Sequence, residues 1–211
     1  RELLTGISGD TLVAVDQTYL GFTEKSEDDD ILETLAQFND SLVLIRSLSK
    51  VEGLAGLRLG YAKSTAQTAK LIAETLPFSG GLYISEMALS GALAAVSGPV
   101  AAEHRRQVLT FYQDEQSWLR RQLEDLGLDT FGAEAPFFVL RAPRPALEQV
   151  VEEGAALQIF SFEGDVDQER CPAVCLVADR ASNLSTIRML KSALEKTGLP
   201  NWAEMMKPIF G

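Results

Sequence analysis

The chain has 211 residues, of which 46% are hydrophobic and 23% charged; this composition is typical of a folded globular chain and too apolar for intrinsic disorder. Its 19 Lys and Arg against 30 Asp and Glu give a net charge of −11. That charge disfavours a nucleic-acid partner, because a surface that follows phosphates needs a basic excess. No apolar run approaches the ~20 residues that span a bilayer, so we expect no membrane partner.

The chain has few residues that could bind a structural metal, since its only thiol and imidazole side chains are those of Cys171, Cys175 and His104. A structural zinc site uses about four such ligands, and we therefore expect no metal. His104 lies in the charged stretch 103–106 and is expected on a solvated helix face. The cysteines are expected to be small apolar residues of a strand, which fits a reducing cytoplasm.

The first part of the chain predicts two buried strands. An apolar run at 12–15 ends in Asp16, as in a parallel strand with an acidic residue at its carboxyl end. A short amphipathic helix is expected at 31–38, and a second buried strand at 41–45 leads into a polar loop. A glycine-punctuated stretch covers 53–62, and from there to about residue 126 the pattern is helical.

The longest helix is expected at 99–126, opened by Gly98-Pro99 and closed by Gly127. Beyond it the elements become shorter. Strands are expected at 137–140, 157–160 and 173–178, and helices at 145–153 and 182–197. The sequence thus indicates an α/β chain of two domains, residues 1–127 and 128–211, with the boundary within or just after the long helix.

Polar side chains gather at the ends of the two early strands. They are Asp16, Tyr19, Ser47, Ser49, Lys50 and, further on, Arg58. In open α/β sheets ligands bind beyond the carboxyl ends of the strands, so these side chains could converge. Together they would suit a phosphorylated aromatic cofactor. The glycine-rich stretch lacks the Gly-Lys-Ser/Thr ending of a nucleotide phosphate loop, and no Gly-x-Ser-x-Gly elbow occurs.

Three sequence blocks carry a family resemblance: Asp-Gln-Thr-Tyr at 16–19, Ser-Leu-Ser-Lys at 47–50 and Gly-Leu-Ala-Gly-Leu-Arg-Leu-Gly-Tyr at 53–61. They occur in order, with 34 positions from Asp16 to Lys50 and 8 from Lys50 to Arg58. The chain resembles the fold-type I, class I/II pyridoxal-phosphate-dependent aminotransferases, nearest to the histidinol-phosphate aminotransferase branch. The resemblance covers nearly the whole chain. It implies the latter part of a large cofactor-binding domain, a mostly parallel sheet with helices, followed by a small α+β domain.

The resemblance also implies roles for individual residues. Lys50 would bind the cofactor aldehyde covalently and then move the substrate α-proton. Asp16 would pair with the pyridinium nitrogen and keep it protonated, so that the ring serves as an electron sink. Tyr19 would donate to the phenolic oxygen of the ring.

A second group would hold the cofactor phosphate. The resemblance implies Ser47 and Arg58 for this role, because a guanidinium matches phosphate oxygens with two parallel donors. Ser49 would support that loop.

The chain departs from the family pattern in two places. The arginine that usually binds the substrate carboxylate is replaced by Val174, so Arg180 and Arg170 are the nearby alternatives. A partner upstream of residue 1 is the third alternative. The upstream segments of such families, with a glycine-rich phosphate turn and an aromatic that stacks on the ring, find no match before Asp16. The chain therefore looks truncated at its N-terminus, and by itself it is expected to hold pyridoxal phosphate weakly or not at all.

The function that the resemblance implies is transfer of an amino group between an amino acid and a 2-oxo acid by a cytoplasmic homodimer. Histidinol phosphate or a similar amino donor fits the branch. Two alternatives stay open. One is an amino-acid decarboxylase of the threonine-phosphate type, and the other is a non-catalytic fragment that keeps the fold for dimerisation.

Overall fold

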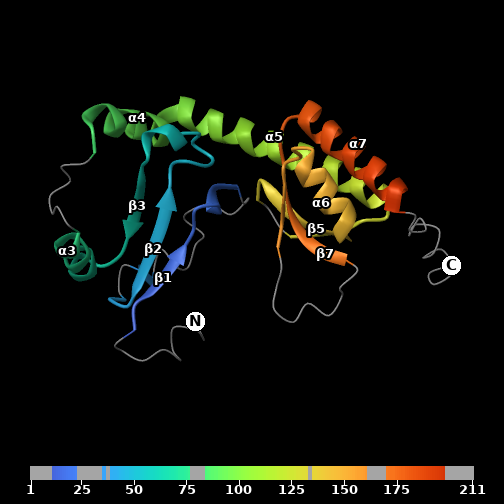
Figure 1. Cartoon of the computed structure of the whole chain (residues 1–211). Helices are drawn as coiled ribbons and strands as arrows, with labels where there is room; N and C mark the ends of the chain where they lie inside the picture. The colour runs from blue at the N-terminus through green and yellow to red at the C-terminus, as the bar shows by residue number, and fades with distance from the viewer. Residues whose placement is uncertain are drawn as a thin grey trace. The chain divides into compact units, whose positions relative to one another are not determined.

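The computed structural model describes residues 11–22, 35–36, 39–76, 84–132, 135–160 and 170–197 (Figure 1). The chain forms two compact units, Arg1–Leu109 and Thr110–Gly211. They divide within the long helix α5, which covers Gly98–Asp125. The domain boundary near residue 127 that the sequence favours stays a prediction.

The first unit contains a three-stranded sheet in the order β1-β2-β3 (Figure 1). Its strands are β1 (Val13–Asp16), β2 (Leu42–Ser47) and β3 (Gly60–Lys63). β1 runs parallel to β2, with Asp16 opposite Ile45, whereas β3 is antiparallel to β2. The two expected parallel strands are thus confirmed, and their carboxyl ends lie at the same edge of the sheet.

Burial differs between the two parallel strands. Leu42, Val43 and Leu44 of β2 are buried, as expected. In β1 burial alternates, with Ala14 and Asp16 exposed. β1 is therefore half-buried and not fully buried as expected, because only Val13 and Val15 of this strand pack against the apolar cluster of Leu42 and Leu44.

The strand β3 is a second difference from the sequence-based expectation. It takes in the end of the glycine-punctuated stretch, where no strand was expected. At Gly60 a side-chain Cβ would lie 2.7 Å from the backbone oxygen of Arg46. Glycine is therefore required here by the close approach of β3 to β2.

Two helices follow β3, and each begins at a hydroxyl cap. These are α3 (Ala66–Thr75) and α4 (Glu86–Val96). The side chains of Thr65 and Ser85 accept hydrogen bonds from the backbone N–H groups three residues on, which satisfies donors that the first turn leaves open. Of the helix expected at 31–38, residues 35 and 36 are described, and both are helical.

The second unit contains an antiparallel sheet in the order β4-β5-β7-β6. Its strands are β4 (Asp129–Phe131), β5 (Phe137–Pro143), β6 (Leu157–Ile159) and β7 (Arg170–Leu176). β5, β6 and β7 match the three expected strands to within a few residues. The three-residue β4 was not expected.

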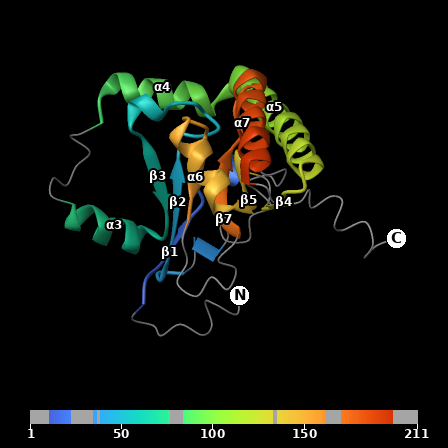
Figure 2. The same cartoon turned by 45° about the vertical axis from the view of Figure 1, so that its right-hand side comes forward.

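Two helices, α6 (Arg144–Glu152) and α7 (Arg180–Thr197), complete the second unit. They pack against each other and lie side by side in both views (Figures 1 and 2). The core joins these helices to the sheet and to the C-terminal part of α5. Its fully buried members include Leu119, Leu123, Phe138, Leu140, Leu147, Val150, Ala173 and Leu190. The expected α/β class, with a small α+β unit at the end, is confirmed.

Candidate active site

The predicted site residues come from the carboxyl ends of β1 and β2. Asp16 is the last residue of β1, and Tyr19 precedes the short 3₁₀ helix η1 (Leu20–Phe22). Ser47 is the last residue of β2, and Lys50 lies three residues further on. Because β1 and β2 are parallel, both sets of side chains lie at one edge of the sheet, as ligand-binding groups do in open α/β sheets.

Asp16 is held by a local turn. Its Oδ1 accepts hydrogen bonds from the backbone N–H of Thr18, at 2.9 Å, and from the Thr18 hydroxyl. The Thr18 hydroxyl, then the Thr18 N–H and, as a smaller cause, the charge of Lys50 lower the pKa of this carboxyl. Asp16 is therefore ionised at neutral pH and can accept a hydrogen bond from a protonated ring nitrogen.

Lys50 lies beside Tyr19. Its Nζ is 4.9 Å from the centre of the Tyr19 ring, within the range of a cation–π contact. Since Lys50 also lowers the pKa of Asp16 through its charge, the first two sequence blocks meet here. The structure thus brings together a primary amine, a phenol and an ionised carboxylate.

The Lys50 loop is anchored on both sides. Leu48 and Val51 flank its tip, and both are buried. The N–H of Gly53 donates to the oxygen of Lys50 at 2.9 Å, which closes a turn around the lysine. On the other side of the loop, the N–H of Ser49 donates to the Ser47 Oγ at 3.1 Å. These contacts hold the backbone of Lys50 while its side chain stays exposed.

Arg58 follows the 3₁₀ helix η3 (Ala55–Leu57) in a left-handed conformation, with φ 51° and ψ 46°. Within the described ranges it alone among non-glycine residues has a positive φ. Such a conformation costs roughly 1–2 kcal/mol for most side chains, and strain of this kind is common at functional loops. Its Nη1 donates to the oxygen of Ala55 at 3.0 Å. The next residue, Leu59, accepts a hydrogen bond from the N–H of Leu48 at 3.2 Å and so ties this block to the Lys50 loop.

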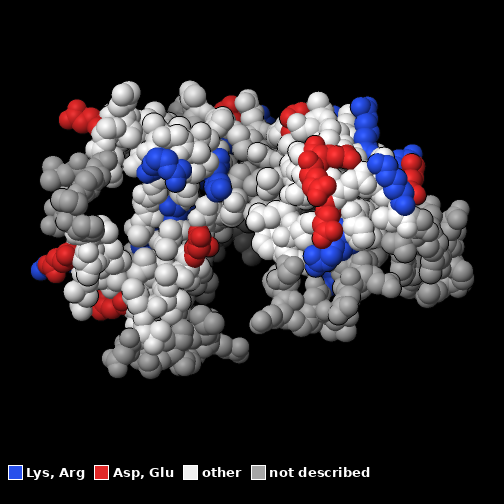
Figure 3. All heavy atoms as spheres, in the orientation of Figure 1, with Lys and Arg blue, Asp and Glu red and all other residues white. Residues whose placement is uncertain are grey.

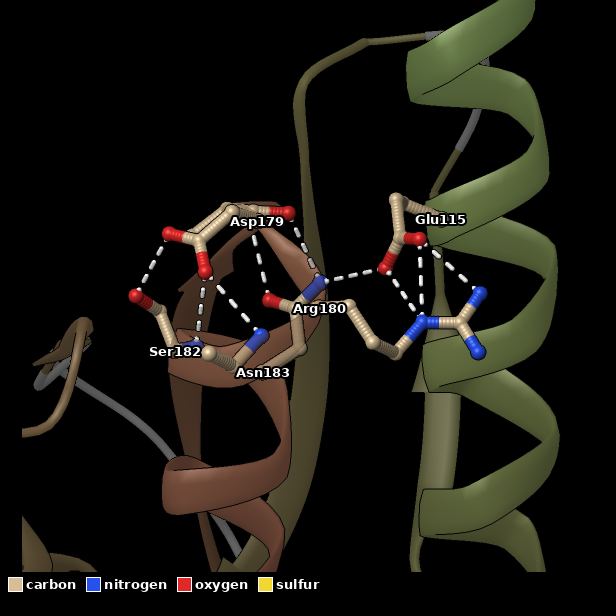
Figure 4. A network of polar contacts seen from close by, with 7 residues as sticks. Glu115, Asp179, Arg180, Ser182 and Asn183 are labelled. Carbon is tan, nitrogen blue, oxygen red and sulfur yellow. Dashed lines mark hydrogen bonds and ion pairs between the residues drawn. The ribbon is translucent and has the colours of Figure 1, made fainter.

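Arg180, the first residue of α7, has a partner that the sequence did not suggest. Its Nε lies 3.0 Å from each carboxylate oxygen of Glu115, and its Nη2 is 2.9 Å from Oε1 (Figure 4). Its guanidinium also lies 3.9 Å from the centre of the Trp118 ring. Glu115 and Trp118 stand on α5 at the i and i+3 spacing that places both on one helix face. That spacing was the only signal in the sequence.

Glu115 is buried, and Asn183 donates to it as well, at 3.0 Å. Hydrogen bonds from Arg180, then from Asn183, lower the pKa of this carboxyl against the opposing effect of burial. Nearby, Asp179 caps α7 by accepting from the N–H groups of Ala181 and Ser182 (Figure 4). The hydrogen bonds to Glu115 hold the start of α7 against α5.

The other two positions of the predicted carboxylate site lie in β7. Val174 stands between Val139 of β5 and Gln158 of β6, in the middle of the sheet. Arg170 begins β7, opposite Pro143, and its side chain lies outside the described residues.

One buried pair beside the site was not expected from the sequence. The Nε of Arg46 donates to the Oε1 of Gln17 at 2.9 Å, and both side chains are buried. The signal available was a charged residue, Arg46, directly after the apolar run 42–45.

Other surfaces of the described chain offer less. A hollow of about 470 Å³ in the first unit is lined by Tyr61 and by residues of α4 and α5, and it includes none of the predicted site residues. On the face drawn in Figure 3, Lys and Arg side chains lie in small groups among Asp and Glu. His104 is exposed on α5, as expected. Among described residues, no group of three His, Cys, Asp or Glu could hold a metal ion.

The described helices include none that is both long and apolar enough to cross a membrane.

Comparison with known proteins places the chain in a family. The family described as "Aminotransferase class I and II" matches residues 3–169. The chain belongs to the class I and II aminotransferase family. The resemblance that the three sequence blocks carry is thereby confirmed.

Individual relatives narrow the similarity. The chain is 33% identical over 142 residues to histidinol-phosphate aminotransferase 1 of Psychrobacter arcticus. The aligned region covers 66% of this chain and 34% of that protein. It is 32% identical over 149 residues to the histidinol-phosphate aminotransferase of Symbiobacterium thermophilum, covering 70% of this chain and 38% of that protein. The chain thus spans less than half the length of these curated relatives.

Solved structures share the fold. Histidinol-phosphate aminotransferase from Sinorhizobium meliloti, in complex with pyridoxal-5'-phosphate, matches with a TM-score of 0.77 at 18% identity, over 93% of this chain and 52% of that one. L-threonine-O-3-phosphate decarboxylase from Porphyromonas gingivalis matches with a TM-score of 0.66 at 22% identity, over 89% of this chain and 56% of that one.

Proposed function

We propose that this chain is part of a pyridoxal-phosphate-dependent enzyme that transfers an amino group between an amino acid and a 2-oxo acid. Family membership and the names of the relatives support this proposal. The observation that carries it is the meeting of Lys50, Tyr19 and ionised Asp16 at one edge of the sheet. Histidinol phosphate or a similar amine is the donor that the relatives suggest.

The polar groups of the described site fit this cofactor chemically. An amine is available for its carbonyl, a carboxylate for its ring nitrogen and a phenol for its ring oxygen. When bound, pyridoxal phosphate supplies an electron sink that no side chain offers. We assign Lys50 to bind the cofactor carbonyl and to move the substrate α-proton, Asp16 to keep the ring nitrogen protonated, and Tyr19 to donate to the ring oxygen.

The phosphate would be held by the loops that follow β2. Ser47 offers a hydroxyl, Arg58 a guanidinium, and Ser49 supports the loop through its N–H bond to Ser47. Arg58 is exposed, so its donors can turn toward an anion, and a guanidinium binds phosphate oxygens with two parallel hydrogen bonds. These assignments extend the family resemblance to residues of this chain.

For the substrate carboxylate we propose Arg180 or Arg170. The Arg180 side chain is about half exposed, but Glu115 accepts hydrogen bonds from its Nε and pairs with its Nη2. A substrate carboxylate would therefore have to compete with Glu115 for this cation. An amino-acid Michaelis constant that rises for only one of Arg180→Gln and Arg170→Gln would identify the partner.

Covalent trapping tests the cofactor assignment. The chain is incubated with excess pyridoxal phosphate, reduced with borohydride and mapped by mass spectrometry. Because reduction makes the link to the amine irreversible, label accumulates even when the cofactor is held weakly. We therefore expect one phosphopyridoxyl group, on Lys50, and its loss in Lys50→Ala. Lys63→Ala is the matched control, because Lys63 also lies over a tyrosine ring, with its Nζ 5.8 Å from the centre of Tyr61. Label on Lys63 in place of Lys50 would contradict the assignment, whereas label on neither lysine would favour the non-catalytic alternative.

The reaction type has its own test. The decarboxylase alternative is supported by the shared fold with the threonine-phosphate enzyme. With histidinol phosphate and a 2-oxo acid, an aminotransferase converts the 2-oxo acid into the corresponding amino acid. Release of carbon dioxide from an amino-acid substrate, without that product, would favour the decarboxylase.

We also propose that the enzyme works as a homodimer in the cytoplasm. Apolar side chains exposed along α4 and the start of α5, such as Met87, Leu93 and Val100 at 80%, 58% and 82%, are compatible with burial against a second copy. Two buried free cysteines are compatible with a reducing compartment. Sedimentation equilibrium would measure the oligomeric state, and a monomer at all concentrations would contradict it.

A further inference from the structure

The three sequence blocks of the candidate site meet at one buried residue, Arg46. It is 5% exposed and stands in β2 immediately before Ser47. Its Nε donates to Gln17, the residue after Asp16, at 2.9 Å. Its backbone oxygen faces Gly60, where a Cβ would come within 2.7 Å. Arg46 thus contacts one residue of the first block and one of the third, and it directly precedes the second block.

On the β1 side, Gln17 is tied to β2 twice. Its backbone N–H donates to the oxygen of Ile45 at 2.8 Å, and its side chain accepts from Arg46. Gln17 lies between Asp16 and Thr18, which are the two ends of the turn that holds the Asp16 carboxylate. Fixing Gln17 therefore fixes the geometry of that turn.

On the β2 side, Arg46 precedes the residue whose hydroxyl supports the Lys50 loop. A buried guanidinium is costly to desolvate, and a well-packed apolar residue often serves stability as well or better. Its presence at the junction of the three blocks therefore points to a role in geometry.

We propose that Arg46, acting through Gln17, is a positioning residue that fixes the Asp16 carboxylate relative to the Lys50 loop. The importance of this position for chemistry rests on the proposed function. The contact itself is testable without cofactor, because the Asp16 turn reports on it through the pKa of Asp16.

The test is a carbon-13 titration of the carboxyl groups by NMR, with the Asp16 signal assigned by its loss in Asp16→Asn. In Gln17→Met and in Arg46→Met the pKa of Asp16 should rise toward the ordinary value for aspartate, because the Thr18 hydrogen bonds loosen. In the double variant the pKa of Asp16 should rise no further than in either single variant. Gln17→Met decides the point, since it changes no charge. Arg120→Met is the matched control, because Arg120 bonds Thr130 and the backbone of Gly132 in the other unit.

An unchanged pKa of Asp16 in Gln17→Met would overturn the proposal, even if Arg46→Met raised it, because Arg46 would then act through its charge. If neither methionine variant folds, Arg46→Lys decides instead: it keeps the charge but loses the Nε donor, and an unchanged pKa of Asp16 would overturn the proposal. Borohydride labelling at limiting cofactor gives a second readout. With the loss of one hydrogen bond, half-labelling of Lys50 should need roughly tenfold more cofactor in Gln17→Met. Failure of the parent chain to label at Lys50 would count against the proposed function alone.

Discussion

Both carboxylate oxygens of Glu115 accept a hydrogen bond from the Nε of Arg180, each at 3.0 Å. The guanidinium lies at the same time 3.9 Å from the centre of the Trp118 ring, so its plane and its charge are both engaged. Glu115 is buried, while the Arg180 side chain is 48% exposed. The pair therefore stabilises the second unit, because water has little access to the buried Glu115 carboxylate. Any other anion that binds Arg180 must compete with this carboxylate.

The first prediction is that Glu115→Gln lowers the free energy of unfolding by about 1–3 kcal/mol, because a buried acceptor of charge-assisted hydrogen bonds loses its charge. The matched control is Glu103→Gln, which breaks an exposed ion pair with Arg106 on the same helix. The control should unfold at the same urea concentration as the parent chain. Equal midpoints for Glu115→Gln and its control would contradict the prediction.

The second prediction concerns acid. Asp16 and Glu115 both have a lowered pKa in the folded chain, the first through Thr18 and the second through Arg180. A carboxyl with a lowered folded pKa contributes stability above its unfolded pKa and loses it as the pH falls through the folded pKa. Stability should thus decline below about pH 4–5. In Glu115→Gln the decline should be shallower, which urea unfolding at a series of pH values would measure.

Much of the fold was predictable because apolar runs and stop signals agree locally. The strands β5, β6 and β7 and the helices α5, α6 and α7 all lie within a few residues of their expected positions. The strand β3 could not be predicted from its pattern. It is a short strand with a glycine at its start, and the reason for that glycine is the backbone of Arg46, which is distant in sequence.

The candidate site shows the same division. That Asp16 and Ser47 end neighbouring parallel strands follows from two apolar runs with polar ends, and the structure confirms the pairing of those strands. The bond between Arg46 and Gln17 spans 29 positions and leaves no local pattern. Likewise, Arg180 and Glu115 are 65 positions apart. Contacts between distant side chains depend on packing, so only the structure reveals them.

The third prediction is that Cys171 and Cys175 resist alkylation in the folded chain. Both are free and buried, and burial raises the pKa of Cys175 to about 12, so almost no thiolate is present at pH 8. Iodoacetamide should label both only after unfolding in urea. Because the folded pKa is raised, this thiol lowers stability as the pH rises above its unfolded pKa of about 8.5. Rapid labelling of Cys175 without urea would contradict this account.

The fourth prediction separates two glycines of the same motif. Gly60→Ala should lower the free energy of unfolding by roughly 1–3 kcal/mol, because the new Cβ would lie 2.7 Å from the backbone oxygen of Arg46 and backbone cannot rotate away. Gly56→Ala is the control, since no atom lies within 4 Å of its Cβ position. Urea unfolding of both variants measures the difference. A loss for Gly56→Ala equal to that for Gly60→Ala would show that the close approach is not the cause.

The fifth prediction is that Arg58 binds an anion but adds backbone strain that lowers the free energy of unfolding. Its φ of 51° is left-handed, a conformation that asparagine adopts more readily than arginine. Arg58→Asn should therefore leave the free energy of unfolding unchanged or raise it by up to about 1 kcal/mol, even though the bond from Nη1 to Ala55 is lost. Because the cation is also lost, half-labelling of Lys50 by pyridoxal phosphate and borohydride should need more cofactor. Arg58→Lys keeps the charge but cannot donate two parallel hydrogen bonds. Its free energy of unfolding should match that of the parent chain. Its half-labelling concentration of cofactor should lie between those of the parent chain and Arg58→Asn. The same half-labelling concentration in the parent chain and in Arg58→Asn would show that Arg58 does not hold the phosphate.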